Sequence, residues 1–321
     1  MKAIIQNEFG TADVLKYTDV ERPRIAEHEL LIKVAYTSVN YADIKKRTGN
    51  KGNGEFPFTL GLDAAGIVEE ISAHSKFAIG DRVIAFPKSG TYAEYAVANE
   101  QLVFKIPNAL SLKEAAAMPT VSILSYILLH EIGQIRQEDT LLIHSAAGGV
   151  GSMLVQLAKL TGVEKIIATV GNLEKAEYVR SLGADVVCTY DTFAEQVLKE
   201  TNQDGANVIF DSVAGDVTSK SLKCLAMYGT LVQFGNSSGT AGTFKTSDVH
   251  SSCQSVKGFS LGTTRKHRPE RLAPVAEIVL NLFAAKKIIL PIAKTFHLSE
   301  SSLAHQLVES RKYEGKVLIE I

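Results

Sequence analysis

The sequence predicts a mixed α/β protein in which a doubly wound parallel sheet is inserted into a β-rich domain. Three observations support this fold class: short apolar strands alternate with helices in the middle of the chain, β-rich sequence precedes that region, and a closing strand follows it. Alternating strands and helices bury a parallel sheet on both faces. We therefore expect one domain from residues 1–118 and 258–321, and an inserted domain from residues 119–257.

The first third of the chain predicts strands, because short apolar runs are bounded there by glycine, proline and aspartate. These strands are expected at residues 28–40, 63–71, 80–86 and 91–107. A helix should begin after Ser111, because Glu114 stands three residues later. In this capping-box pattern each side chain satisfies a free backbone N–H at the helix start. Helical sequence continues to about residue 133.

From Thr140 onward strands and helices alternate. Strands are expected at residues 140–144, 165–170, 185–190, 207–213 and 230–235, with helices at residues 150–162, 173–183, 194–202 and 218–229. The remaining sequence predicts one clear helix at residues 274–287 and a final strand at residues 315–321.

Composition excludes several classes of protein. The 321 residues have a formal net charge of -1, which argues against nucleic acid as the main partner. Cys188, Cys224 and Cys253 are too few and too widely spaced for a disulfide framework, and they fit a reducing compartment. No apolar run has the length of a membrane span, and the N-terminus lacks a signal-peptide pattern. We expect a soluble cytoplasmic protein.

A glycine-rich segment, "AAGGVG" at residues 146–151, follows the first strand of the alternating region and opens a helix. Glycines in this context let the backbone approach a pyrophosphate, and the helix N-terminus offers free N–H groups to it. Ala147, Gly148, Gly149 and Val150 are therefore predicted to bind a dinucleotide. A tight strand-to-helix turn without a ligand is the alternative.

The end of the second strand favours NADPH over NADH. A dinucleotide without a 2′-phosphate usually needs an acidic residue there to hold the ribose hydroxyls, but this position contains Gly171. Gly171 leaves room, Lys175 offers a positive charge, and Tyr190 offers an aromatic wall at the end of the third strand. Glu174 argues the other way, because its carboxylate is placed to serve as the ribose acid.

Ten segments occur in an order that resembles the medium-chain dehydrogenase/reductase superfamily, most of all its zinc-free quinone oxidoreductase branch, the zeta-crystallin group. They are "VNYAD", "GLDAAGIV", "GDRVIAF", "YAEYAV", "AAGGVG", "VGNLEKAE", "LGAD", "FDSV", "FGNSSG" and "ESRKYEGKVLI". The resemblance covers essentially the whole chain. It implies a GroES-like catalytic domain split around a Rossmann domain, a cleft between the two, and a homodimer.

Metal ligands are missing where zinc-dependent members of this superfamily have them. This chain has Asn40 in place of a cysteine, and Leu62 and Asp63 in place of a His-Glu pair. An amide and an aliphatic side chain are poor zinc ligands. His250 and Cys253 form an isolated pair that we interpret as a loop histidine and a free thiol. We therefore predict no bound metal.

Without a Lewis acid, hydride transfer to an electrophilic acceptor is easier than alcohol oxidation. We expect an NADPH-dependent enzyme that reduces quinones or α,β-unsaturated carbonyls. The resemblance places Asn40 beside the nicotinamide ribose or the substrate carbonyl, although a buried amide that caps a turn is an equal alternative. Tyr41 is a candidate proton donor, as are Tyr126, water and the cofactor ribose.

The remaining cofactor contacts are expected near the end of the fifth strand and near the C-terminus. They are Phe234, Gly235, Asn236, Ser237 and Lys316. The alternative function is a zeta-crystallin-like NADPH-binding protein with a nucleic-acid-binding or structural role. The basic run at residues 265–271 is a candidate patch for it, and we interpret this run as a solvated loop.

Overall fold

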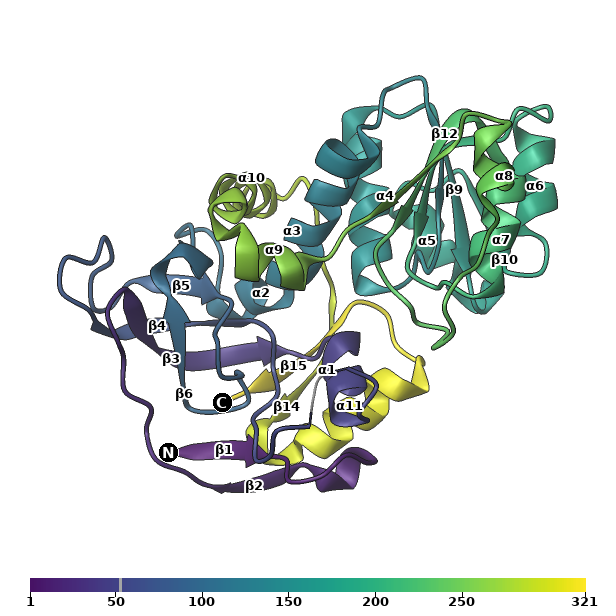
Figure 1. The fold of residues 1–321 in the computed structure, drawn as a ribbon. Helices are drawn as coiled ribbons and strands as arrows, with labels where there is room; N and C mark the ends of the chain where they lie inside the picture. Colours follow the sequence, from purple (N-terminus) through teal and green to yellow (C-terminus); the bar gives the residue numbers. More distant parts are fainter. Residues whose placement is uncertain (52–53) are drawn as a thin grey trace. The chain divides into compact units, whose positions relative to one another are not determined.

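The computed structural model describes residues 1–51 and 54–321. The chain divides into two compact units (Figure 1). Unit 1 consists of Met1–Ile123 and Thr264–Ile321, and unit 2 consists of Leu124–Thr263. The two ends of the sequence thus share one unit, and the middle forms the other.

Unit 2 contains a parallel six-stranded sheet, so the predicted doubly wound fold class is confirmed. The strand order is β10-β9-β8-β11-β12-β13. The strands are β8 (Thr140–Ile143), β9 (Lys165–Val170), β10 (Val186–Thr189), β11 (Ala206–Asp211), β12 (Leu225–Gln233) and β13 (Ser255–Gly258). The first four agree with the predicted strands. β12 includes most of the strand expected at residues 230–235 but begins at Leu225, so the helix expected at residues 218–229 is wrong from Leu225 onward, where the chain pairs with β11 instead. β13 was not predicted.

Helices cover both faces of this sheet (Figure 1). They are α4 (Gly149–Thr161), η4 (Leu173–Lys175), α5 (Ala176–Ser181), α6 (Phe193–Glu200), α7 (Asp216–Lys223) and α8 (Thr246–His250). Figure 1 shows α6, α7 and α8 together on one face, where Phe193, Val197 and Leu222 pack into a buried apolar cluster. The strand order reverses between β8 and β11, which is the switch point where doubly wound sheets bind ligands.

Unit 1 is built around a seven-stranded sheet. Its strands are β3 (Glu29–Ser38), β4 (Ala64–Ile71), β5 (Arg82–Ala85), β6 (Tyr95–Asn99), β7 (Val103–Lys105), β14 (Ile292–His297) and β15 (Lys316–Glu320). A separate hairpin pairs β1 (Lys2–Ile5) with β2 (Lys16–Asp19). The C-terminal β15 pairs antiparallel with β3, where Leu318 lies opposite Ser38. This pairing joins the two ends of the chain.

The helices of unit 1 connect and cover these strands. They are η1 (Ala12–Val14), α1 (Tyr41–Arg47), η2 (Glu100–Leu102), α2 (Leu112–Ala117), η5 (Pro269–Arg271), α10 (Leu272–Ala284), η6 (Leu298–Glu300) and α11 (Ser301–Ser310). Two helices cross the boundary between the units: α3 (Pro119–Ile127), which continues as the π-helical segment η3 (Leu128–Gly133), and α9 (Leu261–His267).

The capping box predicted at the start of α2 is confirmed. The backbone N–H of Glu114 donates to Ser111 Oγ at 3.1 Å, and the backbone N–H of Ser111 donates to the Glu114 carboxylate at 2.9 Å. Among all the helices in the described residues, none is long and apolar enough to cross a membrane.

Candidate functional site

Glycines build the turn between β8 and α4. Gly148 caps the helix, and its carbonyl accepts the first helical hydrogen bond from Ser152 N at 2.8 Å. A Cβ atom on Gly151 would lie 2.3 Å from the Ser145 carbonyl oxygen and 2.6 Å from Ala146 Cα. Glycine is therefore required for α4 to pack this closely on the turn.

The predicted phosphate-contact residues Ala147, Gly148, Gly149 and Val150 all lie in this turn and in the first turn of α4. Gly148 is exposed, and Ala147, Gly149 and Val150 are half-buried. The first N–H groups of an α-helix have no carbonyl partner within that helix. These donors, together with the positive end of the helix dipole, fit a pyrophosphate.

No acidic side chain stands at the end of β9. Gly171 is exposed, and a Cβ atom there would meet nothing within 4 Å. Asn172 accepts a hydrogen bond from Glu174 N at 3.0 Å and donates one to the Glu174 carboxylate at 2.7 Å. The carboxylate that would serve as the ribose acid is therefore held by Asn172. Lys175 is half-buried at the end of η4.

Tyr190 connects the end of β10 to the glycine turn. Its hydroxyl oxygen accepts a hydrogen bond from Ser145 N at 2.9 Å and lies 2.9 Å from Ser145 Oγ. The Tyr190 ring stacks on His144, with 5.9 Å between the ring centroids. His144 is fully buried between the hydroxyls of Thr169 and Ser221, each 2.9 Å away, and burial lowers its pKa to about 4.

The segment Phe234, Gly235, Asn236 and Ser237 follows β12 and lies against the end of β11. Phe234 N donates to Asp211 O at 3.0 Å, and Ser237 N donates to Ser212 O at 2.9 Å. A Cβ atom on Gly235 would lie 2.9 Å from that same Ser212 oxygen. The close approach of the two segments therefore requires glycine at this position.

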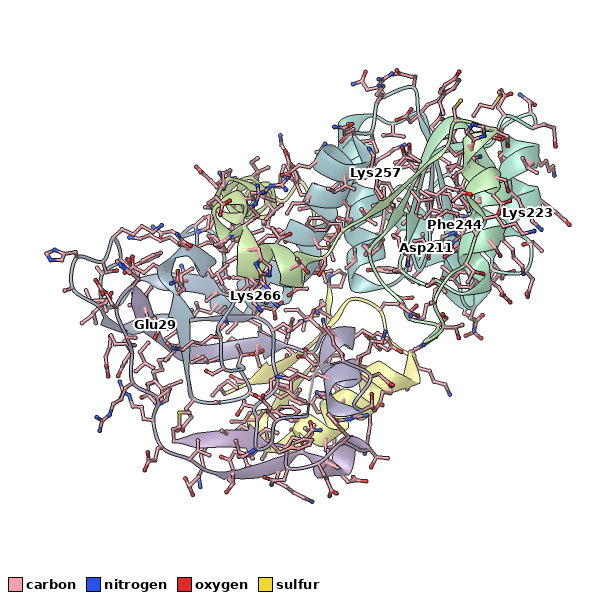
Figure 2. The ribbon with its side chains drawn as sticks, in the orientation of Figure 1. Glu29, Asp211, Lys223, Phe244, Lys257 and Lys266 are labelled. Atoms are coloured by element: carbon pink, nitrogen blue, oxygen red, sulfur yellow. The ribbon has the colours of Figure 1, made fainter. Side chains whose placement is uncertain are left out.

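Asp211, labelled in Figure 2, fixes the loop after β11. Its buried carboxylate accepts hydrogen bonds from Val213 N at 2.7 Å, Ala214 N at 3.0 Å and Thr218 Oγ1 at 2.6 Å. The four segments described above follow β8, β9, β10 and β12. Because all strands of this sheet are parallel, these segments lie at one edge, the carboxyl edge, where the strand order reverses.

Asn40 in unit 1 bridges a buried cation and a buried carboxylate. Its Oδ1 accepts a hydrogen bond from Lys316 Nζ at 2.8 Å, and its Nδ2 lies 3.3 Å from both carboxylate oxygens of Asp63. Lys316 also donates to Val39 O at 3.1 Å, and Asp63 accepts from Ser38 Oγ at 2.7 Å. Burial lowers the pKa of Lys316, while Asp63 and Asp43 oppose that shift.

A second buried carboxylate, that of Asp43, lies in the first turn of α1. It accepts hydrogen bonds from Asn40 N at 2.9 Å and Gly61 N at 3.1 Å. Burial raises the pKa of Asp43 to about 7, a shift that these two backbone bonds oppose. The carboxyl group of Asp43 therefore titrates near neutral pH.

The structure brings Asn40 and Lys316 together but separates Tyr41 from them. Tyr41 begins α1 with its side chain exposed, and the guanidinium of Arg311 lies 6.0 Å from its ring centroid. Lys316 belongs to β15 in unit 1, whereas the other predicted cofactor contacts belong to unit 2. Asn40 and Lys316 are nearly fully buried.

Asp63 and Arg265 were missed as site residues by sequence reasoning. The interpretation of residues 265–271 as a solvated loop is wrong: residues 265–267 belong to α9, residues 269–271 form η5, and Arg265 is half-buried. Arg265 donates to Leu62 O at 3.1 Å, and its guanidinium lies 4.9 Å from the centroid of the Phe86 ring. The only sequence feature that pointed to Asp63 was that Leu62 and Asp63, in the segment "GLDAAG", stand in place of the His-Glu pair of zinc-dependent members.

The thiols of unit 2 are poorly suited to metal binding. Burial raises the pKa of Cys188 to about 11 and that of Cys224 to about 12, so both stay protonated at neutral pH. Cys253 is exposed, and His250 ends the short helix α8. Residues 1–51 and 54–321 contain no group of three or more His, Cys, Asp or Glu side chains arranged to hold a metal ion.

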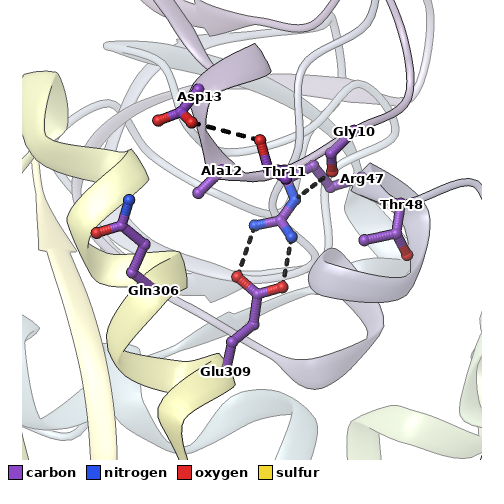
Figure 3. A pocket seen from close by; sticks show the side chains of 8 residues that line it. All are labelled: Gly10, Thr11, Ala12, Asp13, Arg47, Thr48, Gln306 and Glu309. Carbon is purple, nitrogen blue, oxygen red and sulfur yellow. Dashed lines mark hydrogen bonds and ion pairs between the residues drawn. The ribbon is translucent and has the colours of Figure 1, made fainter.

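A hollow of about 400 Å³ lies in unit 1 beside α1 and α11 (Figure 3). Arg47 lies on its wall almost fully buried and forms two hydrogen bonds to the Glu309 carboxylate, at 2.5 and 3.0 Å. A third bond joins Arg47 Nε to Gly10 O at 3.1 Å, and Arg47 also contacts His305 at 3.3 Å. Because the guanidinium is occupied by these protein groups, it acts as a structural clamp between α1 and α11.

Comparison with known proteins identifies the family. The model of the alcohol dehydrogenase GroES-like domain matches residues 26–108, and the model of the zinc-binding dehydrogenase domain matches residues 149–279. A probable quinone oxidoreductase of Schizosaccharomyces pombe is 33% identical, over 98% of this chain and 95% of that protein. The chain belongs to the quinone oxidoreductase family of medium-chain dehydrogenases/reductases.

Other members of the quinone oxidoreductase family are similarly close. The quinone oxidoreductase of Pseudomonas aeruginosa is 32% identical, over 97% of both chains. The crystal structure of Escherichia coli quinone oxidoreductase complexed with NADPH superposes with a TM-score of 0.94 at 29% identity and covers 100% of both chains. Unit 1 is thus the GroES-like part of the fold and unit 2 the Rossmann-like part.

Proposed function

We propose that this protein is an NADPH-dependent oxidoreductase that transfers a hydride to a quinone or to another conjugated carbonyl compound. The observation that supports this most is the glycine turn at the switch point of the unit 2 sheet, with Gly171 in place of a ribose-binding acid. Membership of the quinone oxidoreductase family supports the acceptor class, and the NADPH complex of the E. coli relative supports the cofactor.

The residues of unit 2 would hold NADPH along the carboxyl edge of the sheet. Backbone N–H groups of Gly148, Gly149 and Val150 would bind its pyrophosphate, with Ala147 shaping the turn. Gly171 leaves space for the 2′-phosphate, and the half-buried Lys175 offers a charge for it. The other proposed contacts along this edge are Tyr190, Phe234, Gly235, Asn236 and Ser237.

NADPH supplies the hydride when it is bound, and the groups of unit 1 act on the acceptor. Asn40 is held between Lys316 and Asp63, so its amide is fixed before an acceptor arrives. We propose that Asn40 lies beside the nicotinamide ribose or the substrate carbonyl as a positioning group, because its own amide atoms are already paired with Lys316 and Asp63. The exposed Tyr41 hydroxyl remains the proposed proton donor, and Lys316 remains a proposed cofactor contact.

We also propose that turnover needs no zinc. The support is chemical: Asn40 and Leu62 are poor ligands, and the thiols of Cys188 and Cys224 are held protonated. We further propose that the protein is a homodimer and that it is located in the cytoplasm. The three unpaired cysteines support a reducing compartment.

The decisive experiment measures NADPH oxidation by the purified protein with 9,10-phenanthrenequinone and with an enone. Turnover should persist after dialysis against a zinc chelator, and the KM for NADPH should be below that for NADH. If calorimetry detects no binding of NADPH or of NADH to the protein, the proposed function is refuted. A KM for NADH equal to or below that for NADPH would refute the coenzyme preference.

A further inference from the structure

Asp211 ends β11, and its carboxylate is a fully buried group to which the proposed function assigns no role. Burial of a carboxylate is costly unless hydrogen bonds satisfy it. Its Oδ1 accepts hydrogen bonds from Val213 N at 2.7 Å and Ala214 N at 3.0 Å, and its Oδ2 accepts one from Thr218 Oγ1 at 2.6 Å. These bonds tie the end of β11 to the loop that follows it and to α7.

The loop after β11 has an unfavourable backbone conformation. Ala214 has a φ of 63° and Gly215 a φ of 60°, in the left-handed region that alanine rarely adopts. Such a conformation persists only where surrounding contacts hold it. The bond from Ala214 N to the Asp211 carboxylate is such a contact, so loss of the carboxylate should let the loop relax.

This loop in turn supports the segment after β12. Ser237 N donates to Ser212 O at 2.9 Å, and Ser238 N donates to Val213 O at 3.0 Å. Val213 therefore links the two segments directly, because its N–H donates to Asp211 and its carbonyl accepts from Ser238. The position of Ser237 and Ser238 thus depends on the Asp211 carboxylate.

A second route from Asp211 to the chain after β12 runs through Thr218. A Cβ atom on Gly242 would lie 2.5 Å from Thr218 Oγ1 and 2.7 Å from Thr218 Cβ, so the chain at Gly242 packs tightly on this side chain. The same hydroxyl donates to Asp211. The buried carboxylate therefore supports the chain after β12 at two places, residues 237–238 and residue 242.

The strand order indicates which part of NADPH this segment would meet. Neighbouring strands of the sheet follow one another as β9-β8-β11-β12. In the proposed binding mode, Gly171 after β9 faces the 2′-phosphate and the glycine turn after β8 binds the pyrophosphate. A cofactor that continues in this direction along the carboxyl edge brings its nicotinamide half to the segments after β11 and β12.

We propose that Asp211 is a positioning residue for the nicotinamide half of NADPH, because its hydrogen bonds hold in place the segment after β12 on which that half would rest. Asp211 itself need not touch the cofactor. This inference rests on the proposed function and assigns the two halves of the cofactor to different supports. The adenosine half should not depend on Asp211.

The test compares the binding of NADPH with that of 2′-phospho-ADP-ribose, which lacks the nicotinamide ring. Calorimetry gives both Kd values, and the Kd of 2′-phospho-ADP-ribose divided by that of NADPH reports what the nicotinamide contributes. Asp211→Ala should lower this ratio about tenfold, the effect of losing one hydrogen bond to a charged group, and should leave the Kd of 2′-phospho-ADP-ribose unchanged. At saturating NADPH, kcat with 9,10-phenanthrenequinone should fall as well, since a displaced nicotinamide reacts more slowly.

Asp211→Asn separates hydrogen bonding from charge. Its amide oxygen can still accept from Val213 N and Ala214 N, and its NH₂ group can donate to Thr218 Oγ1. The ratio of Kd values should therefore stay near that of the unmodified protein. If Asp211→Asn lowers the ratio as much as Asp211→Ala does, the carboxylate acts through its charge and the positioning role is overturned.

Asp216→Ala is the matched control, because Asp216 is an exposed aspartate at the start of α7 and its loss changes the net charge equally. An unchanged ratio in Asp211→Ala, or an equal fall in Asp216→Ala, would overturn the inference and leave the proposed function intact. If Asp211→Ala does not fold, Thr218→Val decides the question. It removes one donor to the carboxylate and keeps the shape of the side chain, so the ratio should fall about fivefold, and an unchanged ratio would overturn the inference. If the unmodified protein binds neither NADPH nor NADH, the proposed function is overturned and the inference with it.

Discussion

Lys316 Nζ donates a hydrogen bond to Asn40 Oδ1 at 2.8 Å, and this bond joins the last strand of unit 1 to the N-cap of α1. The other end of the Asn40 amide faces the Asp63 carboxylate at 3.3 Å. The carbonyl thus points to a cation and the NH₂ group to an anion. One orientation of the amide is fixed by these opposite charges.

Replacement of Lys316 by methionine should destabilise the protein. The substitution keeps the apolar stem but leaves the carbonyl oxygens of Asn40 and Val39 without their buried donor. An unsatisfied buried acceptor costs about 1–3 kcal/mol, and we expect a loss of that size in the free energy of unfolding measured with urea. Lys312→Met, at an exposed position of the same segment, should stay within about 0.5 kcal/mol of the original protein.

Asp43 should make the stability of the protein fall as pH rises. Its pKa is about 7 in the folded protein against an ordinary value of 3.8, so the folded state binds more protons than the unfolded state between these values. The contribution of Asp43 is therefore present at low pH and lost as pH rises towards 7. In Asp43→Asn this part of the pH dependence should disappear. Urea unfolding of both proteins between pH 4.5 and 8 measures the difference, and parallel curves would contradict the assignment.

His144 should make the stability of the protein rise as pH rises. Its pKa is lowered to about 4 in the folded protein, so the unfolded state binds the proton more readily. Stability from the neutral imidazole is complete above about pH 6.5 and is lost as pH falls towards 4. Proton NMR of the imidazole tests this directly. A His144 resonance that titrates near pH 6.5 would show that the ring is not desolvated in the way described.

Gly151→Ala should strain the junction between β8 and α4. The added methyl group would lie 2.3 Å from a backbone oxygen, which no side-chain rotation can relieve. We expect a loss of about 1–3 kcal/mol in stability by thermal unfolding, together with weaker NADPH binding. Gly171→Ala is the control for removing a glycine, since its Cβ would meet nothing within 4 Å. Equal melting temperatures for the two variants would contradict the close packing at Gly151.

Gly171→Asp should shift the coenzyme preference from NADPH towards NADH. A carboxylate at the end of β9 would repel a 2′-phosphate and accept hydrogen bonds from an unphosphorylated ribose. We expect the ratio of kcat/KM for NADPH to that for NADH to fall about tenfold or more, a change of about 1.4 kcal/mol. If the ratio stays constant, Gly171 does not lie at the adenosine ribose.

The sequence predicted those features that are encoded locally. The capping box of Ser111 and Glu114 and the glycine turn after β8 each depend on residues within one helical turn of one another. By contrast, β13 and α11 were not predicted. β13 has four residues, none of them fully buried, and it is a strand because the edge of β12 pairs with it. Tertiary pairing of this kind has no signal in a short window.

The unit 1 site was only partly predictable for the same reason. Asn40 was a candidate, but its partners Asp63 and Lys316 lie 23 and 276 positions away in the sequence. Charge composition could not separate Arg265 from the exposed residues Lys266 and Arg268 beside it in the same basic run. Only the fold shows which of them turns toward Leu62.

The pairing of β3 with β15 also constrains how the protein is made on the ribosome. β3 emerges early, but its neighbour β15 is translated only after all of unit 2. The Rossmann-like sheet, whose strands come from one continuous stretch, can fold while translation continues. β6 pairs with Glu29–Lys33 of β3 before unit 2 is made, but the end of β3 at Tyr36–Ser38 must stay without β15 until unit 2 has been translated. The GroES-like sheet is therefore completed late, and slow translation exposes this end of β3 to aggregation for longer.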